Sequence, residues 1–408
     1  MRSPVLSTDR SRRKLRVLLA VPPAGVALVL ATWFAIHHVP WLGPALADGA
    51  RAVFGPNAVA WAEDTAYGWQ DRWDQWRHGT DAPATYWQND PARAAVAASA
   101  APAASFDGGA SPDAHFPPPP GKILFQHVAA KSDGVWFPIG GMPDATGAPI
   151  MVKTMVHPDR ERPYTVLAVV AMDADDIRLH AVPGKVEPQD PTLPESQRPG
   201  VVSPDDTEQL LAAFNGGWQT IHGHYGMMVN GHTLLPAQPE SCTVAIYRDG
   251  HLRIAPWTAI ASTASDLAAF RQTPPCLAAG GMRHPELDNM YNTSWGAVAA
   301  GRTVLRRSAI GLSADGRTLF FGMGDSLTAR SIADGMLAVG AYDVAQLDIN
   351  HVFPRFVFFR QEARNLRRDR VRSLVRWVFF QPERLHTPAD ASRLFLRDPS
   401  CAGCDVRG

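Results

Sequence analysis

A chain of 408 residues, 46% of them hydrophobic, has enough apolar side chains to build a globular core. Its 39 Lys and Arg residues balance its 39 Asp and Glu residues, which excludes a general electrostatic affinity for nucleic acid. Partners therefore have to be inferred from local features, and we predict no nucleic-acid partner.

The chain opens with a basic flank at residues 1–16 and an almost uncharged apolar run at 17–36. Twenty helical residues span the roughly 30 Å hydrocarbon core of a membrane, and a basic flank stays on the cytoplasmic side. We therefore predict a transmembrane signal anchor with a cytoplasmic N-terminus, which places the main domain in the periplasm or outside the cell. Prolines at 22–23 and small residues at 45–47 leave a cleaved, secreted form as the alternative.

Tryptophans recur with helix-like spacing after this segment and predict an amphipathic helix over residues 57–78. Its aromatic stripe can lie at a lipid headgroup layer or pack on the protein itself, and both interpretations stay open. Residues 81–121 then turn to Ala, Pro, Ser and Gly and end in four prolines, a composition typical of a semi-rigid linker.

The sequence from residue 122 to 359 mixes short apolar runs with turn residues, as in one globular α+β domain with mixed sheets and short helices. The run at 165–170 predicts a buried strand, and the alternation at 177–182 predicts a half-exposed one.

Two helices are expected in the same domain. Ser203-Pro204 followed by two aspartates predicts a helix start, with the helix running to about residue 212. A second helix is expected at 331–339, followed by a strand at 344–347.

Residues 360–408 form an arginine-rich C-terminal segment. It can bind anionic lipid or phosphorylated glycan, or it can be an ordinary solvated surface with salt bridges. Four cysteines can pair as Cys242 with Cys276 and Cys401 with Cys404 in an exported protein, although spacing alone does not fix the connectivity.

Three sites along the domain carry residue types suited to a phosphorylated sugar. The glycines Gly216 and Gly217 let backbone N–H groups approach an anionic oxygen, and Asn215 beside them adds a side-chain amide. Arg307 offers a planar fork for two phosphate oxygens. Asp348, at the end of an apolar strand, can act as nucleophile, as general base, or as a group that orients a sugar hydroxyl.

In order along the chain these motifs resemble the phosphodiester glycosidase family. The resemblance covers residues 122–359, is strongest at 305–350, and rests on Phe214-Asn215-Gly216-Gly217-Trp218, Arg307-Ser308-Ala309-Ile310-Gly311, Ala314-Asp315-Gly316-Arg317-Thr318-Leu319-Phe320-Phe321 and Leu347-Asp348. It implies an α+β fold and hydrolysis at the anomeric carbon of a sugar-1-phosphodiester. It also implies catalytic roles for Asn215, Arg307 and Asp348.

The chain departs from the family directly after this aspartate. The family follows it with a glycine run and a serine, whereas here Ile349, Asn350 and His351 follow. Because Ile349 adds a Cβ, close backbone approach to a phosphate is harder. Either Asn350 and His351 supply side-chain donors to the substrate instead, or hydrolysis has been lost.

His222 and His224 flank a glycine, and a strand would put both on one face. Because no third ligand is evident, we predict neither a metal site nor a cofactor. His224 either lines the sugar pocket or is an ordinary loop histidine.

The sequence thus predicts an envelope-tethered hydrolase of a glycan or phosphorylated polymer, in which positioning and electrostatic stabilisation supply most of the catalysis. The alternative is a non-catalytic envelope module that binds phosphorylated glycan or a protein partner through the same pocket. A third interpretation is a structural tether that depends on the tryptophan-rich helix and the arginine-rich tail.

Overall fold

The computed structural model describes part of the chain and divides it into two compact units, residues 1–63 and residues 64–408. The described residues are 31–32, 34–35, 46, 49–50, 52–79, 81, 115–139, 149–184, 188, 190, 198, 210–289, 294–296, 304–349, 354–358 and 373–378. The predicted amphipathic helix is present as α3 (Pro56–His78). No helix among the described residues is both long enough and apolar enough to cross a membrane, and most of segment 17–36 lies outside them.

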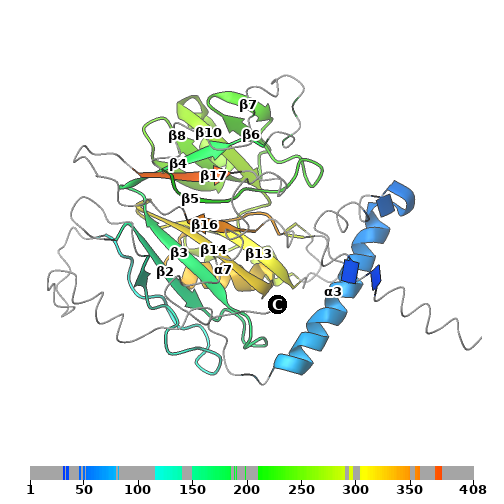
Figure 1. Cartoon of the computed structure of the whole chain (residues 1–408). Coiled ribbons are helices and arrows are strands. Elements are labelled where there is room, and N and C mark those ends of the chain that lie inside the picture. The colour runs from blue at the N-terminus through cyan, green and yellow to red at the C-terminus, as the bar shows by residue number, and fades with distance from the viewer. Residues whose placement is uncertain are drawn as a thin grey trace, which may run out of the picture. The chain divides into compact units, whose positions relative to one another are not determined.

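The second unit is built on an eight-stranded antiparallel sheet (Figure 1). Its order is β1 (Phe137–Pro138), β2 (Met151–Val156), β3 (Leu167–Asp173), β14 (Thr318–Leu327), β13 (Leu305–Leu312), β15 (Asp343–Gln346), β11 (Ala278–Ala279) and β12 (Met282–Arg283). All seven residues of β3 are buried, which requires cover on both faces of the sheet. Val169 and Ala171 enter one apolar cluster, and Val170 and Met172 enter another.

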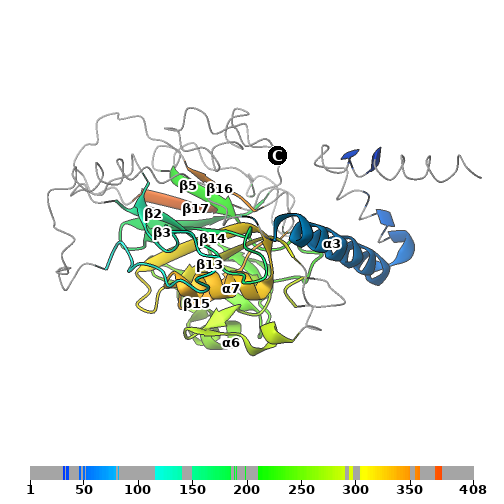
Figure 2. The same cartoon turned by 90° about the horizontal axis from the view of Figure 1, so that it is seen from below.

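Helix α7 (Ala329–Ala338) covers one face, and β5 with β16 lies over the other (Figure 2). The helix begins with a capping box, in which Thr328 Oγ1 accepts from the Ser331 N–H at 2.9 Å and Ser331 Oγ accepts from the Thr328 N–H at 2.8 Å. Gly335 lets the helix approach β3, because a Cβ there would lie 2.5 Å from Leu167 Cδ2. The predicted helix at 331–339 and the strand that follows it are confirmed.

Two smaller sheets complete the unit. The five-stranded sheet has the order β7 (His232–Leu235), β6 (Met227–Val229), β10 (Leu267–Thr273), β8 (Cys242–Tyr247) and β9 (Leu252–Pro256), followed in the chain by α6 (Trp257–Ile260) and the 3-10 turn η2 (Ala261–Asp266). The four-stranded sheet has the order β16 (Phe356–Phe358), β5 (Leu210–Asn215), β17 (Ser373–Val378) and β4 (Ile177–Val182), with β17 parallel to both neighbours. Mixed sheets with few short helices agree with the α+β class. Strand β17 also extends this sheet beyond residue 359.

The predicted helix at 203–212 is wrong where the structure describes it, because residues 210–212 open strand β5. All six residues of β5 are buried, and Phe214 packs on Phe321 and Phe356 at ring-centroid distances of 5.0 and 5.6 Å. Burial on both faces favours a strand over the local helix signal.

The last residues of the predicted linker belong to the domain. The Gly121 N–H donates to Gly134 O at 2.8 Å, and Trp136 Nε1 donates to Pro119 O at 2.9 Å. Residues 82–114 lie outside the described part of the chain.

Candidate functional site

Asn215 and Asp348 meet where β5 and β15 end. Asn215 is the last residue of β5 and is buried, with 3% of its surface exposed. Its Nδ2 donates to Ser308 Oγ at 2.9 Å, and its Oδ1 accepts from the Arg355 N–H at 3.0 Å. The amide is therefore held from both ends.

Ser308 connects this amide to the aspartate loop. Its Oγ donates to the Asp348 carbonyl oxygen at 2.9 Å, while the Asp348 N–H donates to Gly216 O at 3.1 Å. Trp218 Nε1 adds a third bond, to Leu347 O at 3.0 Å. The main chain at Asp348 is thus fixed on both sides, and the residue itself is half-buried.

Arg307 lies on the opposite face of β13 from Ser308, because successive strand side chains alternate. Its guanidinium donates to Leu327 O at 3.0 Å, to Trp295 O at 2.7 Å and to Gln346 Oε1 at 2.8 Å. Burial lowers the pKa of Arg307 to about 9. The Arg307 guanidinium, which the sequence suggested as a phosphate ligand, is therefore directed toward oxygen atoms of the protein itself.

The loop after Gly216 is held by a buried pair that the sequence analysis missed, Arg271 and Gln272 of β10. Arg271 donates to the carbonyl oxygens of Trp218 and Tyr225, and Gln272 Oε1 accepts from the Gly226 N–H at 3.0 Å. Their position inside a largely apolar strand could have indicated this role, because buried polar side chains need hydrogen-bond partners.

The other predicted site residues have different positions. Gly217 lies in a tight position, because a Cβ there would lie 3.2 Å from Gln272 O. His224 is exposed with φ 50°, and His222 is half-buried. Asn350 and His351 lie outside the described residues.

One group of possible metal ligands occurs among the described residues, formed by His115, Asp173 and Asp175. Nε2 of His115 lies 2.8 Å from Asp173 Oδ1 and 3.5 Å from Asp175 Oδ2. Arg317 donates to Asp175 at 2.7 Å and already brings a positive charge to the group.

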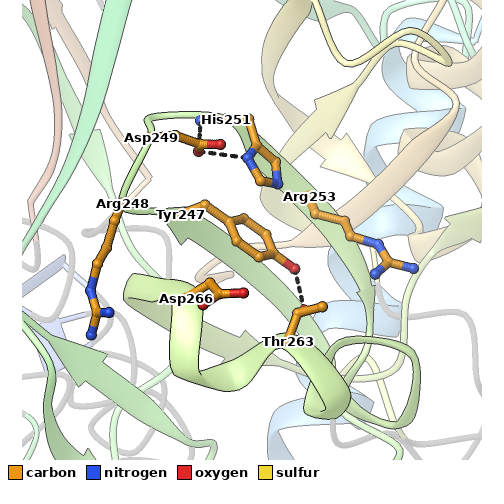
Figure 3. Close-up of a pocket in the computed structure, with 7 residues that line it drawn as sticks. All are labelled: Tyr247, Arg248, Asp249, His251, Arg253, Thr263 and Asp266. Carbon is orange, nitrogen blue, oxygen red and sulfur yellow. Dashed lines mark hydrogen bonds and ion pairs between the residues drawn. The ribbon is translucent and has the colours of Figure 1, made fainter.

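A separate hollow of about 440 Å³ lies on the five-stranded sheet (Figure 3). The rings of Tyr247 and His251, which both line it, stack directly on each other with centroids 3.8 Å apart, and Tyr247 Oη lies 2.8 Å from Thr263 Oγ1. Hydrogen bonds from the main chain and ring of His251 lower the pKa of Asp249. None of the sequence-predicted site residues lines this hollow.

Chemically, the end of β15 places one half-buried aspartate on a fixed main chain. Asn215 and Ser308 are buried behind it and position its backbone. Such an arrangement suits a group that must keep one orientation toward a bound substrate.

No family profile matches the sequence, and no curated protein matches it. Among solved structures, the chain is similar to the catalytic domain of zebrafish N-acetylglucosamine-1-phosphodiester alpha-N-acetylglucosaminidase auto-inhibited by its pro-peptide, with 13% identity and a TM-score of 0.35 over 53% of this chain and 76% of that one. It is also similar to a hypothetical protein from Synechocystis, with 8% identity and a TM-score of 0.28 over 45% of this chain and 54% of that one. Both are distant structural likenesses over about half of the chain.

Proposed function

We propose that the chain is a hydrolase that cleaves a sugar from a sugar-1-phosphodiester, with Asp348 as the catalytic carboxylate. The observation that carries this proposal is the hydrogen-bonded series from Asn215 through Ser308 to Asp348, which gathers three distant parts of the sequence at one strand end. A half-buried aspartate on a doubly anchored main chain fits a group that works on a bound substrate.

In the proposed reaction, water adds to the anomeric carbon and the bond from that carbon to the phosphate oxygen breaks. The products are a free sugar and a phosphomonoester: the hydroxyl of water goes to the anomeric carbon, and its proton passes to the leaving phosphate oxygen or to solvent, directly or by way of Asp348. Asp348 stabilises the positive charge that develops on the sugar, or takes the proton from the attacking water.

Arg307 has a positioning role in this proposal. It holds the carbonyls of Trp295 and Leu327, and its burial argues against direct contact with phosphate. The phosphate then depends on the main chain after Gly216 and on residues that follow Ile349.

The compartment is also part of the proposal. The basic flank and apolar run of the first 36 residues favour export. A disulfide between Cys242 and Cys276 supports an oxidising compartment. There the substrates are envelope glycans and phosphorylated polymers.

The test measures free reducing sugar released by the purified full chain from a panel of sugar-1-phosphodiesters. Asp348→Asn should lower the rate by about 100-fold or more, the usual scale for losing a catalytic carboxylate. Asp288→Asn is the matched control, because this exposed aspartate pairs with Arg283 and lies outside the network. Equal rates for wild type and Asp348→Asn would remove Asp348 from the mechanism.

A binding module without turnover is the second candidate, and one observation favours it. Ile349 follows the aspartate where the resembled family has glycine, and its side chain lies close to Gly296, since a Cβ on Gly296 would lie 3.2 Å from Ile349 Cδ1. Saturable retention of phosphorylated glycan with no sugar release from any substrate of the panel would support this candidate and contradict the hydrolase.

A further inference from the structure

The C-terminal half of α3 has two different faces. One face is half-buried and polar, and it is formed by Asp71, Asp74, Gln75 and His78. The other is exposed and is formed by Trp69, Arg72, Trp73, Trp76 and Arg77. Spacings of three and four residues place each set along one side of the helix.

The polar face is fixed to the domain by an ion pair with little exposure to solvent. Arg162 donates through Nε to Asp71 Oδ1 at 2.8 Å and through Nη2 to Asp71 Oδ2 at 2.6 Å. Its Nη1 bonds Asp159 Oδ2 at 3.0 Å. Side-chain exposure is only 7% for Arg162 and 14% for Asp71. This two-pronged geometry fixes both the position and the rotation of the helix.

The exposed face, which we call the tryptophan face, is therefore directed away from the domain. The exposed fractions are 67% for Trp69, 57% for Trp73 and 76% for Trp76. The rings of Trp73 and Trp76 lie 5.1 Å apart, and the Arg72 guanidinium lies 5.8 Å from the ring centre of Trp69. A surface helix normally turns its apolar side inward, and here the sides are reversed.

The chemistry of this face identifies its partner. Tryptophan prefers the layer between lipid headgroups and acyl chains, because its ring is apolar and its N–H is polar. Arg72 and Arg77 on the same face attract anionic headgroups. The predicted membrane segment ends at residue 36, 33 positions before Trp69, so a chain anchored there would carry this face close to a bilayer. We propose that the tryptophan face lies in the headgroup layer of a membrane with anionic lipids.

The test uses the full chain in vesicles of phosphatidylcholine and phosphatidylglycerol, with and without bromine on the acyl chains near the headgroup. Bromine quenches only tryptophans within its reach. Three variants, Trp69→Phe, Trp73→Phe and Trp76→Phe, give the emission of each ring as wild type minus variant. This readout separates the tryptophan face from any insertion of residues 17–36, and substitution of exposed rings leaves the core packing unchanged.

We expect brominated lipid to remove roughly half or more of the emission of each of the three rings, as for tryptophans at the membrane interface. Trp257→Phe is the control, because Trp257 packs on Phe270 with ring centroids 4.9 Å apart and its emission should not change. Full emission from all three rings in brominated vesicles would overturn the proposal. The proposal would also be overturned if brominated lipid did not quench the three rings and their protection from aqueous acrylamide increased with protein concentration. That result would mean that a second copy of the chain covers the tryptophan face.

Discussion

Trp295 links the buried arginine to a titratable neighbour. Its carbonyl oxygen accepts from Arg307 at 2.7 Å and from Gln346 Nε2 at 3.2 Å, and its indole donates to Pro275 O at 2.6 Å. The ring of His284 packs edge-on against it with centroids 5.0 Å apart. A change at His284 therefore acts on the residue that Arg307 holds beside the proposed site.

His284 should make the chain less stable in acid. Burial lowers the pKa of His284 below its ordinary value of 6.5, and its Nδ1 accepts from the Glu286 N–H at 3.2 Å, which only a neutral ring can do. The unfolded state then binds the proton more readily, so stability is full above about pH 6.5 and falls as the pH drops below it. We expect His284→Asn, which keeps a cap acceptor without titrating, to flatten this fall.

The measurement is the free energy of unfolding in urea from about pH 7.5 to about pH 5.5. His127→Asn serves as the control, since His127 is exposed. Parallel pH profiles for wild type and His284→Asn would show that His284 has no part in the acid dependence.

For single residues, the sequence is a better guide to which side chains belong to the site than to the contacts that those side chains make. Asp348 can be selected because it ends an apolar strand and Asn215 because it adjoins a glycine pair, and the structure brings their loops together. The direction in which the Arg307 side chain points cannot be predicted from the residues around it in the sequence. It depends on Trp295 and Leu327, which come from other segments, and on alternation in a strand whose partners the sequence does not specify.

Among the elements, strands and helices with strong local patterns are predictable. The alternation at 177–182 gives β4 with its predicted bounds, and the helix predicted at 331–339 agrees with α7. Strand β5 shows the limit of local patterns. Its first residues follow a good helix start, but the chain is buried between β16 and β17, which lie more than a hundred residues later.

The disulfide joins strand β8 to the connection between two of the sheets. Cys242 begins β8 of the five-stranded sheet, and Cys276 lies between β10 and β11, where the chain passes to the eight-stranded sheet. This pair is one of the two named on sequence grounds, where spacing alone left the connectivity open, and the structure confirms it. Cys401 and Cys404 lie outside the described residues.

Removing this disulfide should cost stability without changing the strand order. A closed loop of 34 residues corresponds to about 3–4 kcal/mol of unfolding free energy in the chain-entropy account. The double variant Cys242→Ala/Cys276→Ala should show this loss in urea denaturation. The matched variant Cys401→Ala/Cys404→Ala should not, and an equal loss in both variants would contradict a special role for the first pair.

For the whole molecule, the attachment of α3 is the feature that sequence reasoning left open. The spacing of the tryptophans predicts the helix itself, and α3 matches the expected range to within one residue. The side that faces the domain depends on Arg162, which is 91 positions from Asp71 in the chain. A pair of residues so far apart in the chain cannot be predicted from the sequence pattern around either of them.

The ion pair between Arg162 and Asp71 should determine how firmly α3, and with it the tryptophan face, is held to the domain. Asp71→Asn removes the negative charge beside Arg162 and should weaken docking of the helix by about 2 kcal/mol, the scale of a charged hydrogen-bonded pair. Asp325→Asn is the matched control, because its pair with Arg306 has side chains 53% and 35% exposed and should contribute less than about 1 kcal/mol. Hydrogen exchange should then quicken at residues 66–78 in Asp71→Asn alone, with the amides of β3 and β14 unchanged. Unchanged exchange in the helix would mean that contacts other than Arg162 hold it to the domain. Faster exchange throughout the sheets would mean that the ion pair stabilises the whole fold and that the helix has no separate attachment.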